Sequence, residues 1–172
     1  DAFFVTKPEN VRYLSGYTGD DACLFFCKDN RLLFTDSRYY LQAKKDVKGF
    51  EVTIARGPDT QVLADISAKL KARKIGFESG HLTCMAYERM ADKLAETGVK
   101  LLPLADAVEG PRQIKDETEI ALIKDSVAVL ENAVLYFKTM LRPGISENDL
   151  ASKTEYFIRA ASGERASFEI IV

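Results

Sequence analysis

The stretch from Ala22 to Thr35 reads ACLFFCKDNRLLFT, and it decides the fold class of this chain. Two runs of apolar, strand-forming residues flank the polar segment from Lys28 to Asn30, whose side chains tolerate a tight reversal of the backbone. The pattern predicts a β-hairpin with strands at Ala22–Cys27 and Arg31–Thr35. A β-sheet is therefore expected to form part of the core.

Further strands are expected on both sides of this hairpin, each a short β-rich run between turn-forming residues. They cover Ala2 to Val5, Glu51 to Ile54, Lys74 to Glu78, and Val99 to Leu102. Amphipathic stretches separate most of them, and this alternation is typical of helices packed on a sheet. The sequence thus predicts an α/β domain over residues 1–108, with a mixed sheet flanked by helices.

Local signals mark where the helices of this domain begin. Pro8 suits the first position of a short helix that ends near Ser15. Asp36 or Ser37 can cap a second helix, and Thr83 a later one. Gly57-Pro58-Asp59 introduces the helix between these two. The side chains expected to face inward at helical spacing are Val62, Leu63, Ile66, Leu70, Tyr87, Met90 and Leu94.

Composition excludes several classes of function. Of the 172 residues, 47% are hydrophobic, and 24 basic residues nearly balance 26 acidic ones, so no strong net charge would attract nucleic acid or anionic membranes. No apolar run approaches the roughly 20 residues that a membrane span needs. The chain also starts without a signal-peptide pattern. We therefore expect no nucleic-acid or membrane partner and a cytoplasmic location.

The cysteines and the single histidine do not form a recognisable site. Cys23 and Cys27 are too far apart along one strand to form a disulfide, so free thiols are expected. His81 stands alone before a helix cap, where a place on the surface of a loop is the simpler interpretation. Neither a histidine-rich metal site nor a serine protease triad with a spare base is expected.

The pattern of apolar and polar residues changes after Leu104. Residues 105–113 lack periodicity and predict a connection to a second, incomplete domain over 109–172. Apolar residues then follow at steps of three and four, which predicts a long helix packed on a domain or, less favoured, a coiled coil. This stripe consists of Ile120, Ile123, Val127, Leu130, Val134, Phe137 and Leu141.

A second helix of this domain is predicted after Pro143-Gly144. Ser146 and Asp149 resemble a capping box, and Ile145 and Leu150 occupy the positions of a hydrophobic staple. Gly163 can end the helix in a left-handed conformation. The last residues, Phe168 to Val172, are expected to form a strand.

Five segments together resemble the Xaa-Pro peptidase and creatinase family. Single-letter segments that carry the resemblance are PENVRYLSGYTG at 8–19, LFTDSRY at 33–39, RQIKDETEI at 112–120, PGISE at 143–147 and SFEIIV at 167–172. They occur in the family's order and extend over most of the chain. The resemblance implies a creatinase/prolidase N-terminal domain, followed by a helical hairpin and one strand of a truncated "pita-bread" catalytic domain.

The resemblance also implies an activity that this chain cannot perform alone. Peptidase members hold two divalent metal ions (Mn, Co or Zn) with residues that lie beyond the segment at 167–172, so no catalytic or metal-binding residue can be assigned here. The full-length protein is expected to be an Xaa-Pro dipeptidase or aminopeptidase. Two alternatives remain open, a metal-free creatinase-like C–N hydrolase and a non-catalytic binding or scaffold protein with the same fold.

The loop from Gly16 to Asp21 is the candidate functional segment. In family homodimers the N-terminal domain leans over the catalytic cleft, often that of the partner subunit, and limits access to short proline-containing peptides. We therefore expect Tyr17, Asp20 and Asp21 at that rim. For Asp36, Arg38 and Tyr39 a structural role is expected, with the guanidinium paired to a carboxylate and the ring packed at the domain surface.

Overall fold

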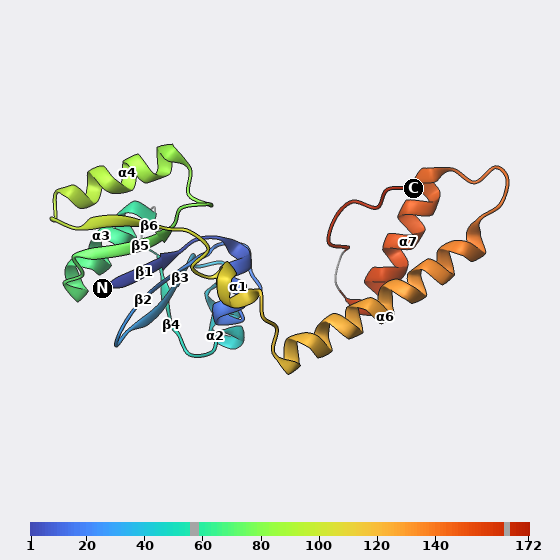
Figure 1. Ribbon diagram of the computed structural model, residues 1–172, viewed down its shortest axis with the longest axis horizontal. Coiled ribbons are helices and arrows are strands. Elements are labelled where there is room, and N and C mark those ends of the chain that lie inside the picture. Colours follow the sequence, from blue (N-terminus) through green and yellow to red (C-terminus); the bar gives the residue numbers. More distant parts are fainter. Residues whose placement is uncertain (56–58, 164–165) are drawn as a thin grey trace. The chain divides into compact units, whose positions relative to one another are not determined.

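The computed structural model describes residues 1–55, 59–163 and 166–172 (Figure 1). The chain divides into two compact units, Asp1–Gln113 and Ile114–Val172. Among the described residues, no helix is both long enough and apolar enough to span a membrane. Each unit is described below by itself.

A six-stranded mixed sheet with the order β4-β3-β2-β1-β5-β6 forms the centre of the first unit. Strand β2 runs antiparallel to both of its neighbours, and all other pairs are parallel. The predicted hairpin is confirmed, as are the predicted strands at Ala2–Val5, Glu51–Ile54 and Lys74–Glu78. The strands are β1 (Ala2–Val5), β2 (Ala22–Cys27), β3 (Arg31–Thr35), β4 (Glu51–Ile54), β5 (Lys74–Glu78) and β6 (Lys100–Leu104).

The last strand lies further along the chain than the predicted range from Val99 to Leu102. Strand β6 pairs with β5 from Lys100 to Leu104, and this range includes Pro103. Proline is tolerated there because β6 is an edge strand, so its missing N–H does not break the central ladder.

Helices cover both faces of the sheet (Figure 1). They are α1 (Pro8–Ser15), α2 (Tyr40–Asp46), α3 (Asp59–Leu70), α4 (Cys84–Ala95) and the short α5 (Glu109–Arg112). Neighbouring strand residues alternate between two cores: Phe25 and Phe34 pack with α3 and α4, whereas Leu24 and Leu33 pack with residues of α1 and α2. The period-two pattern of a strand explains this division. The sheet is buried on both sides.

The start of α2 differs from the sequence prediction. Neither Asp36 nor Ser37 caps this helix, which begins only at Tyr40 after a turn. A carboxylate oxygen of Asp36 instead accepts the backbone N–H groups of Arg38 and Tyr39 at 2.7 and 3.3 Å. Aspartate commonly stabilises a turn in this way. The prediction recognised a local cap but assigned it to the wrong element.

Most predictions for the other helices are confirmed. Thr83 caps α4 by accepting the N–H of Ala86 at 3.2 Å. Tyr87 remains partly exposed, and its ring stacks on Phe77 with centroids 5.4 Å apart. The expected start of α3 at Gly57-Pro58 lies outside the described residues. The predicted inward residues that are buried are Val62, Leu63, Ile66, Met90 and Leu94.

The second unit is a helical hairpin of α6 (Glu117–Met140) and α7 (Glu147–Ser162). The two helices pack together, and the rings of Tyr136 and Phe157 stack with centroids 4.8 Å apart. Ser146 caps α7, although Asp149 bonds to its hydroxyl and not back to its backbone. Gly163 ends α7 with a left-handed φ of 72°.

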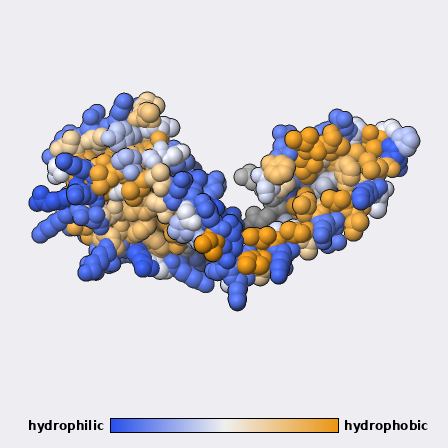
Figure 2. Space-filling view, viewed as in Figure 1, coloured by the Kyte–Doolittle hydropathy of each residue, from blue (hydrophilic) through white to orange (hydrophobic). Residues whose placement is uncertain are grey.

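Much of the apolar stripe on α6 faces outward in this unit. Val127, Leu130 and Val134 are 45–56% exposed, and among the described residues of α6 only Ala133 is fully buried. Figure 2 shows hydrophobic side chains gathered on the surface of the second unit. Packing against α7 therefore covers only part of the predicted stripe.

The strand predicted at Phe168 to Val172 is not formed. A strand needs a neighbour that accepts and donates its backbone hydrogen bonds, and the described part of the second unit contains no other strand. The apolar sequence indicates a tendency to form a strand, but no neighbouring strand is described here to pair with it.

The segment that leads out of the first unit is bonded to that unit. The first unit extends to Gln113 because α5 is tied to its helix α1 and to the end of β1. Lys7 forms an ion pair with Glu109 at 2.7 Å, and Arg112 donates to the side chain of Asn10 at 2.7 Å. The connecting segment thus packs with the domain before it.

Candidate functional site

The loop from Gly16 to Asp21 joins α1 to β2 at the edge where the parallel strands end. Its aromatic residue, Tyr17, is buried, with only 1% of the residue exposed. The hydroxyl of Tyr17 lies 3.4 Å from the side-chain oxygen of Thr35, and burial raises the pKa of this phenol. A Cβ atom on Gly19 would overlap with the ring and hydroxyl of Tyr17. The buried Tyr17 side chain therefore packs beneath Gly19 and stabilises the loop.

Side chains also tie the loop to its neighbours. Thr18 donates a hydrogen bond to Asp46 at 2.9 Å and accepts one from Gln42 at 3.0 Å, and both partners belong to α2. At the other end, Thr35 donates to the backbone carbonyl of Asp21. These contacts hold the loop in one place on the domain.

Two carboxylates of the loop remain exposed, those of Asp20 and Asp21. Near Asp21, the guanidinium of Arg38 lies 3.8 Å from its carboxylate and donates to Asp36 through two nitrogens. These bonds lower the pKa of Asp36. Arg38 also lies over the ring of Tyr39, 5.3 Å from its centroid, a cation–π arrangement.

A polar cavity of about 640 Å³ opens beside this loop. Its lining includes Asp20, Asp21, Asp36 and Asp59, so we asked whether these acids could hold a divalent metal ion. One of them is already bonded to Arg38, and no group of three or more potential metal ligands comes together among the described residues. The acids of this cavity do not fit the pair of metal ions that the family resemblance implies.

A buried glutamate organises a second polar cluster at the same edge of the sheet. Glu78 ends β5 and is only 6% exposed. Its carboxylate accepts the backbone N–H groups of Thr6 and Lys7 at 2.7 and 2.9 Å, and the side-chain amide of Asn10 at 2.6 Å. The carboxylate thus joins the ends of the parallel strands β1 and β5 to helix α1.

Asn10 extends this cluster to the end of the first unit. Its amide also donates to Glu109 at 2.9 Å, and its oxygen accepts the bond from Arg112. The bonds from Lys7 and Asn10 lower the pKa of Glu109 to about 2. No buried side-chain oxygen or nitrogen lacks a partner in the part of the chain that the structure describes. Such complete pairing is typical of a structural network.

Sequence reasoning did not single out Glu78 or Asn10. A usable signal exists for Glu78, because a single acid ends an otherwise apolar strand whose carboxyl end must meet those of its parallel neighbours. Of the other singled-out residues, Cys23 lines the cavity beside the loop, and the backbone N–H of His81 donates to the carbonyl oxygen of Glu78 at 3.2 Å. His81 is exposed in the turn before α4, and the three cysteines are free thiols, with only Cys23 buried.

Comparisons with known proteins place this geometry in a family. The model of the creatinase/prolidase N-terminal domain matches residues 1–114. The "Uncharacterized peptidase YqhT" of Bacillus subtilis is 32% identical over the whole chain, which covers 48% of that relative. The chain therefore spans about half the length of such curated relatives.

Solved structures give the same result. The X-Pro aminopeptidase from Thermotoga maritima superimposes with a TM-score of 0.88 at 31% identity, over 98% of this chain and 49% of its own. The Xaa-Pro dipeptidase from Bacillus anthracis matches with a TM-score of 0.88 at 27% identity, over 98% and 46% of the two chains. The chain thus belongs to the creatinase/prolidase N-terminal domain family, and its relatives include Xaa-Pro dipeptidases and aminopeptidases.

Proposed function

We propose that this chain is the N-terminal, non-catalytic portion of a metal-dependent Xaa-Pro dipeptidase or aminopeptidase. The observation that carries the proposal is the asymmetry of the matches, which cover all or nearly all of this chain but only about half of each peptidase. The full-length protein would hydrolyse the bond before proline in short peptides, as a cytoplasmic homodimer.

The chemistry of the described acids supports the assignment of catalysis to another part of the protein. Glu78 and Glu109 are engaged in hydrogen bonds that hold the fold together, and Asp36 is paired with Arg38. A catalytic acid or a metal ligand needs a free oxygen directed at the reacting group. The two divalent ions of the proposed enzyme would therefore be bound by residues outside this chain.

In this proposal the anchored loop carries out the domain's contribution to function. Asp20 and Asp21 project from a loop that Tyr17, Thr18 and Thr35 hold in place. A loop held by these contacts can exclude long peptides by steric overlap. We assign to it the rim that limits access to the active site, in the homodimer that the family resemblance implies.

The full-length protein provides the test. The protein should release proline from a dipeptide, remove the first residue from a longer Xaa-Pro peptide, or do both, and the activity should require added manganese or cobalt. Hydrolysis of a creatine-like C–N bond that persists in a chelator would contradict the proposal in favour of the creatinase alternative. Absence of hydrolysis under every condition, from folded protein, would favour the scaffold alternative.

A further inference from the structure

Strand β4 is an edge of the sheet with an open side. Among the described residues it pairs with β3 alone, and the backbone N–H of Ala55 continues that ladder by donating to the carbonyl oxygen of Thr35 at 2.8 Å. In a parallel pair alternate residues point their backbone groups at the neighbour. The N–H and C=O groups of Val52 and Ile54 therefore face away from β3. A further strand added at this edge would pair with these groups.

The opposite edge of the sheet is protected, whereas this one is not. Strand β6 carries Lys100 and Pro103, residue types that block the addition of a further strand. Strand β4 has the sequence EVTI, with β-branched residues at three of four positions and neither lysine nor proline. Its composition favours addition of a strand.

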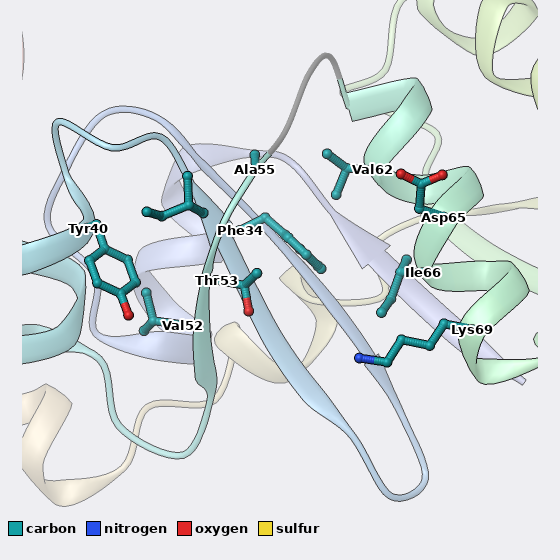
Figure 3. Close-up of a pocket in the computed structure, with 10 residues that line it drawn as sticks. Phe34, Tyr40, Val52, Thr53, Ala55, Val62, Asp65, Ile66 and Lys69 are labelled. Atoms are coloured by element: carbon teal, nitrogen blue, oxygen red, sulfur yellow. The ribbon is translucent and has the colours of Figure 1, made fainter.

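A groove of about 470 Å³ lies along this open edge. Figure 3 shows β4 on one side and helix α3 on the other, with Phe34, Val62 and Ile66 between them. These three side chains are nearly buried, so the floor of the groove is apolar. Alternate side chains of an added strand could enter it, as in peptide recognition by β-strand addition.

The positive charge of Lys69 at one end of the groove indicates the direction in which a peptide strand would add to β4. Lys69 lies on the α3 wall near the end where β4 begins, and Val62 lies near the other end by Ala55 (Figure 3). Lys69 has no ion-pair partner among the described residues, whereas the other charged side chain of the lining, Asp65, accepts a hydrogen bond from Gln61 at 2.7 Å. A strand that adds antiparallel to β4 ends beside the start of β4, so its terminal carboxylate would meet Lys69.

The size of the groove favours a peptide over a second copy of the chain. A stable dimer buries at least about 1,200 Å² of surface, and a strand of four residues offers only a small part of that area. A volume of about 470 Å³ instead falls in the range of pockets that take small ligands. We propose that the groove between β4 and α3 binds a short extended peptide as an added antiparallel strand, with its C-terminal carboxylate at Lys69.

The test uses the full-length protein and a defined probe. The probe is a peptide of about six residues that alternates valine and serine, with fluorescein on its N-terminus and a free C-terminal carboxylate. It contains no proline and no free amine, so it is not a substrate of the proposed peptidase. Fluorescence anisotropy should show saturable binding, with a dissociation constant of about 10–100 μM, and weaker binding of the C-terminal amide.

Two variants examine the two halves of the site. Ile54→Pro removes an N–H that faces the open edge while the ladder to β3 remains, and it should weaken binding about tenfold. Lys69→Glu should remove the preference for the carboxylate over the amide. Lys71→Glu changes the same charge outside the groove and should leave binding unchanged.

The outcomes separate this inference from the proposed peptidase activity. Both groove variants should retain proline release, since no groove residue is assigned to catalysis. Absence of binding, or binding that neither variant alters, would overturn the inference and leave the peptidase proposal intact. A change of oligomeric state in Ile54→Pro by sedimentation, without peptide binding, would assign the edge to a second copy instead.

Discussion

The two units of this chain bury their apolar residues to different degrees. In the first, the sheet is covered on both faces, and Leu24 and Leu33 are fully buried. In the second, two helices cover each other only in part, and Leu130 of α6 is 56% exposed. The first unit has the core of an independent domain, whereas the two-helix hairpin has too little apolar burial for one. Substitutions in the first unit should therefore change the free energy of unfolding more than similar substitutions in the second unit.

The largest difference is expected from matched leucine truncations. Leu33→Ala removes a side chain with no exposed surface and should lower the free energy of unfolding of the first unit by about 3–5 kcal/mol. Leu130→Ala should cost less than about 1 kcal/mol, because its side chain is already in contact with solvent. Urea unfolding followed by circular dichroism measures both. Equal losses of free energy of unfolding in the two variants would contradict the difference in burial between the units.

A polar truncation in the first unit should come next. Glu78→Ala leaves two backbone N–H groups and the amide of Asn10 without their acceptor, which should cost about 2–3 kcal/mol. Glu78→Gln retains one acceptor oxygen and should cost less. The same urea titration distinguishes the two variants, and a Glu78→Ala protein as stable as the original would contradict the structural role of this cluster.

These examples show which features could be predicted from the sequence. The hairpin, most of the strands and the caps at Thr83 and Gly163 depend on neighbouring residues, and the alternating pattern also predicts that the sheet is covered. Burial of Tyr17 depends on Thr35, and the role of Glu78 depends on Thr6, which is 72 residues away. Such pairings arise only when distant strands meet, so local patterns do not reveal them.

The prediction of a strand at Phe168 to Val172 was wrong because strand formation also depends on contacts with distant residues. Its residues have the required propensity, but strand formation depends on a partner that the described residues do not supply. Burial of Tyr17 could not be predicted either, because the identity of a loop residue does not tell whether its ring points outward or into the domain. Asp20 and Asp21 are exposed, so their assignment to the rim remains a prediction.

A smaller effect is expected from pH, again in the first unit. The folded pKa of Glu109 is about 2, below its ordinary value of 4.5, so its carboxylate stabilises the fold above about pH 4.5 and loses this effect as the pH falls toward 2. Because the side chain is 31% exposed, we expect a contribution of only about 1 kcal/mol. Unfolding at pH 7 and pH 3 should show this loss, and Glu109→Gln should reduce it. A loss of unchanged size in Glu109→Gln would rule out this carboxylate as its source.

The smallest effect concerns the exposed loop and requires the full-length protein. Replacing both rim carboxylates, Asp20→Asn with Asp21→Asn, should change the ratio of kcat/KM for a dipeptide and a longer Xaa-Pro peptide about threefold. Asp29→Asn in the hairpin turn removes an equivalent carboxylate away from the loop and should leave the ratio as it was. An unaltered ratio in the double variant would remove the carboxylates from the proposed rim.

The central claim is that this chain contributes a scaffold and an access rim to an Xaa-Pro peptidase but performs no catalysis itself. Its most direct test compares proline release from a dipeptide by the full-length protein and by purified Asp1–Val172 at equal concentration with manganese present. The account predicts release by the full-length protein and none by the shorter chain. Hydrolysis by the shorter chain above the rate without protein would contradict it.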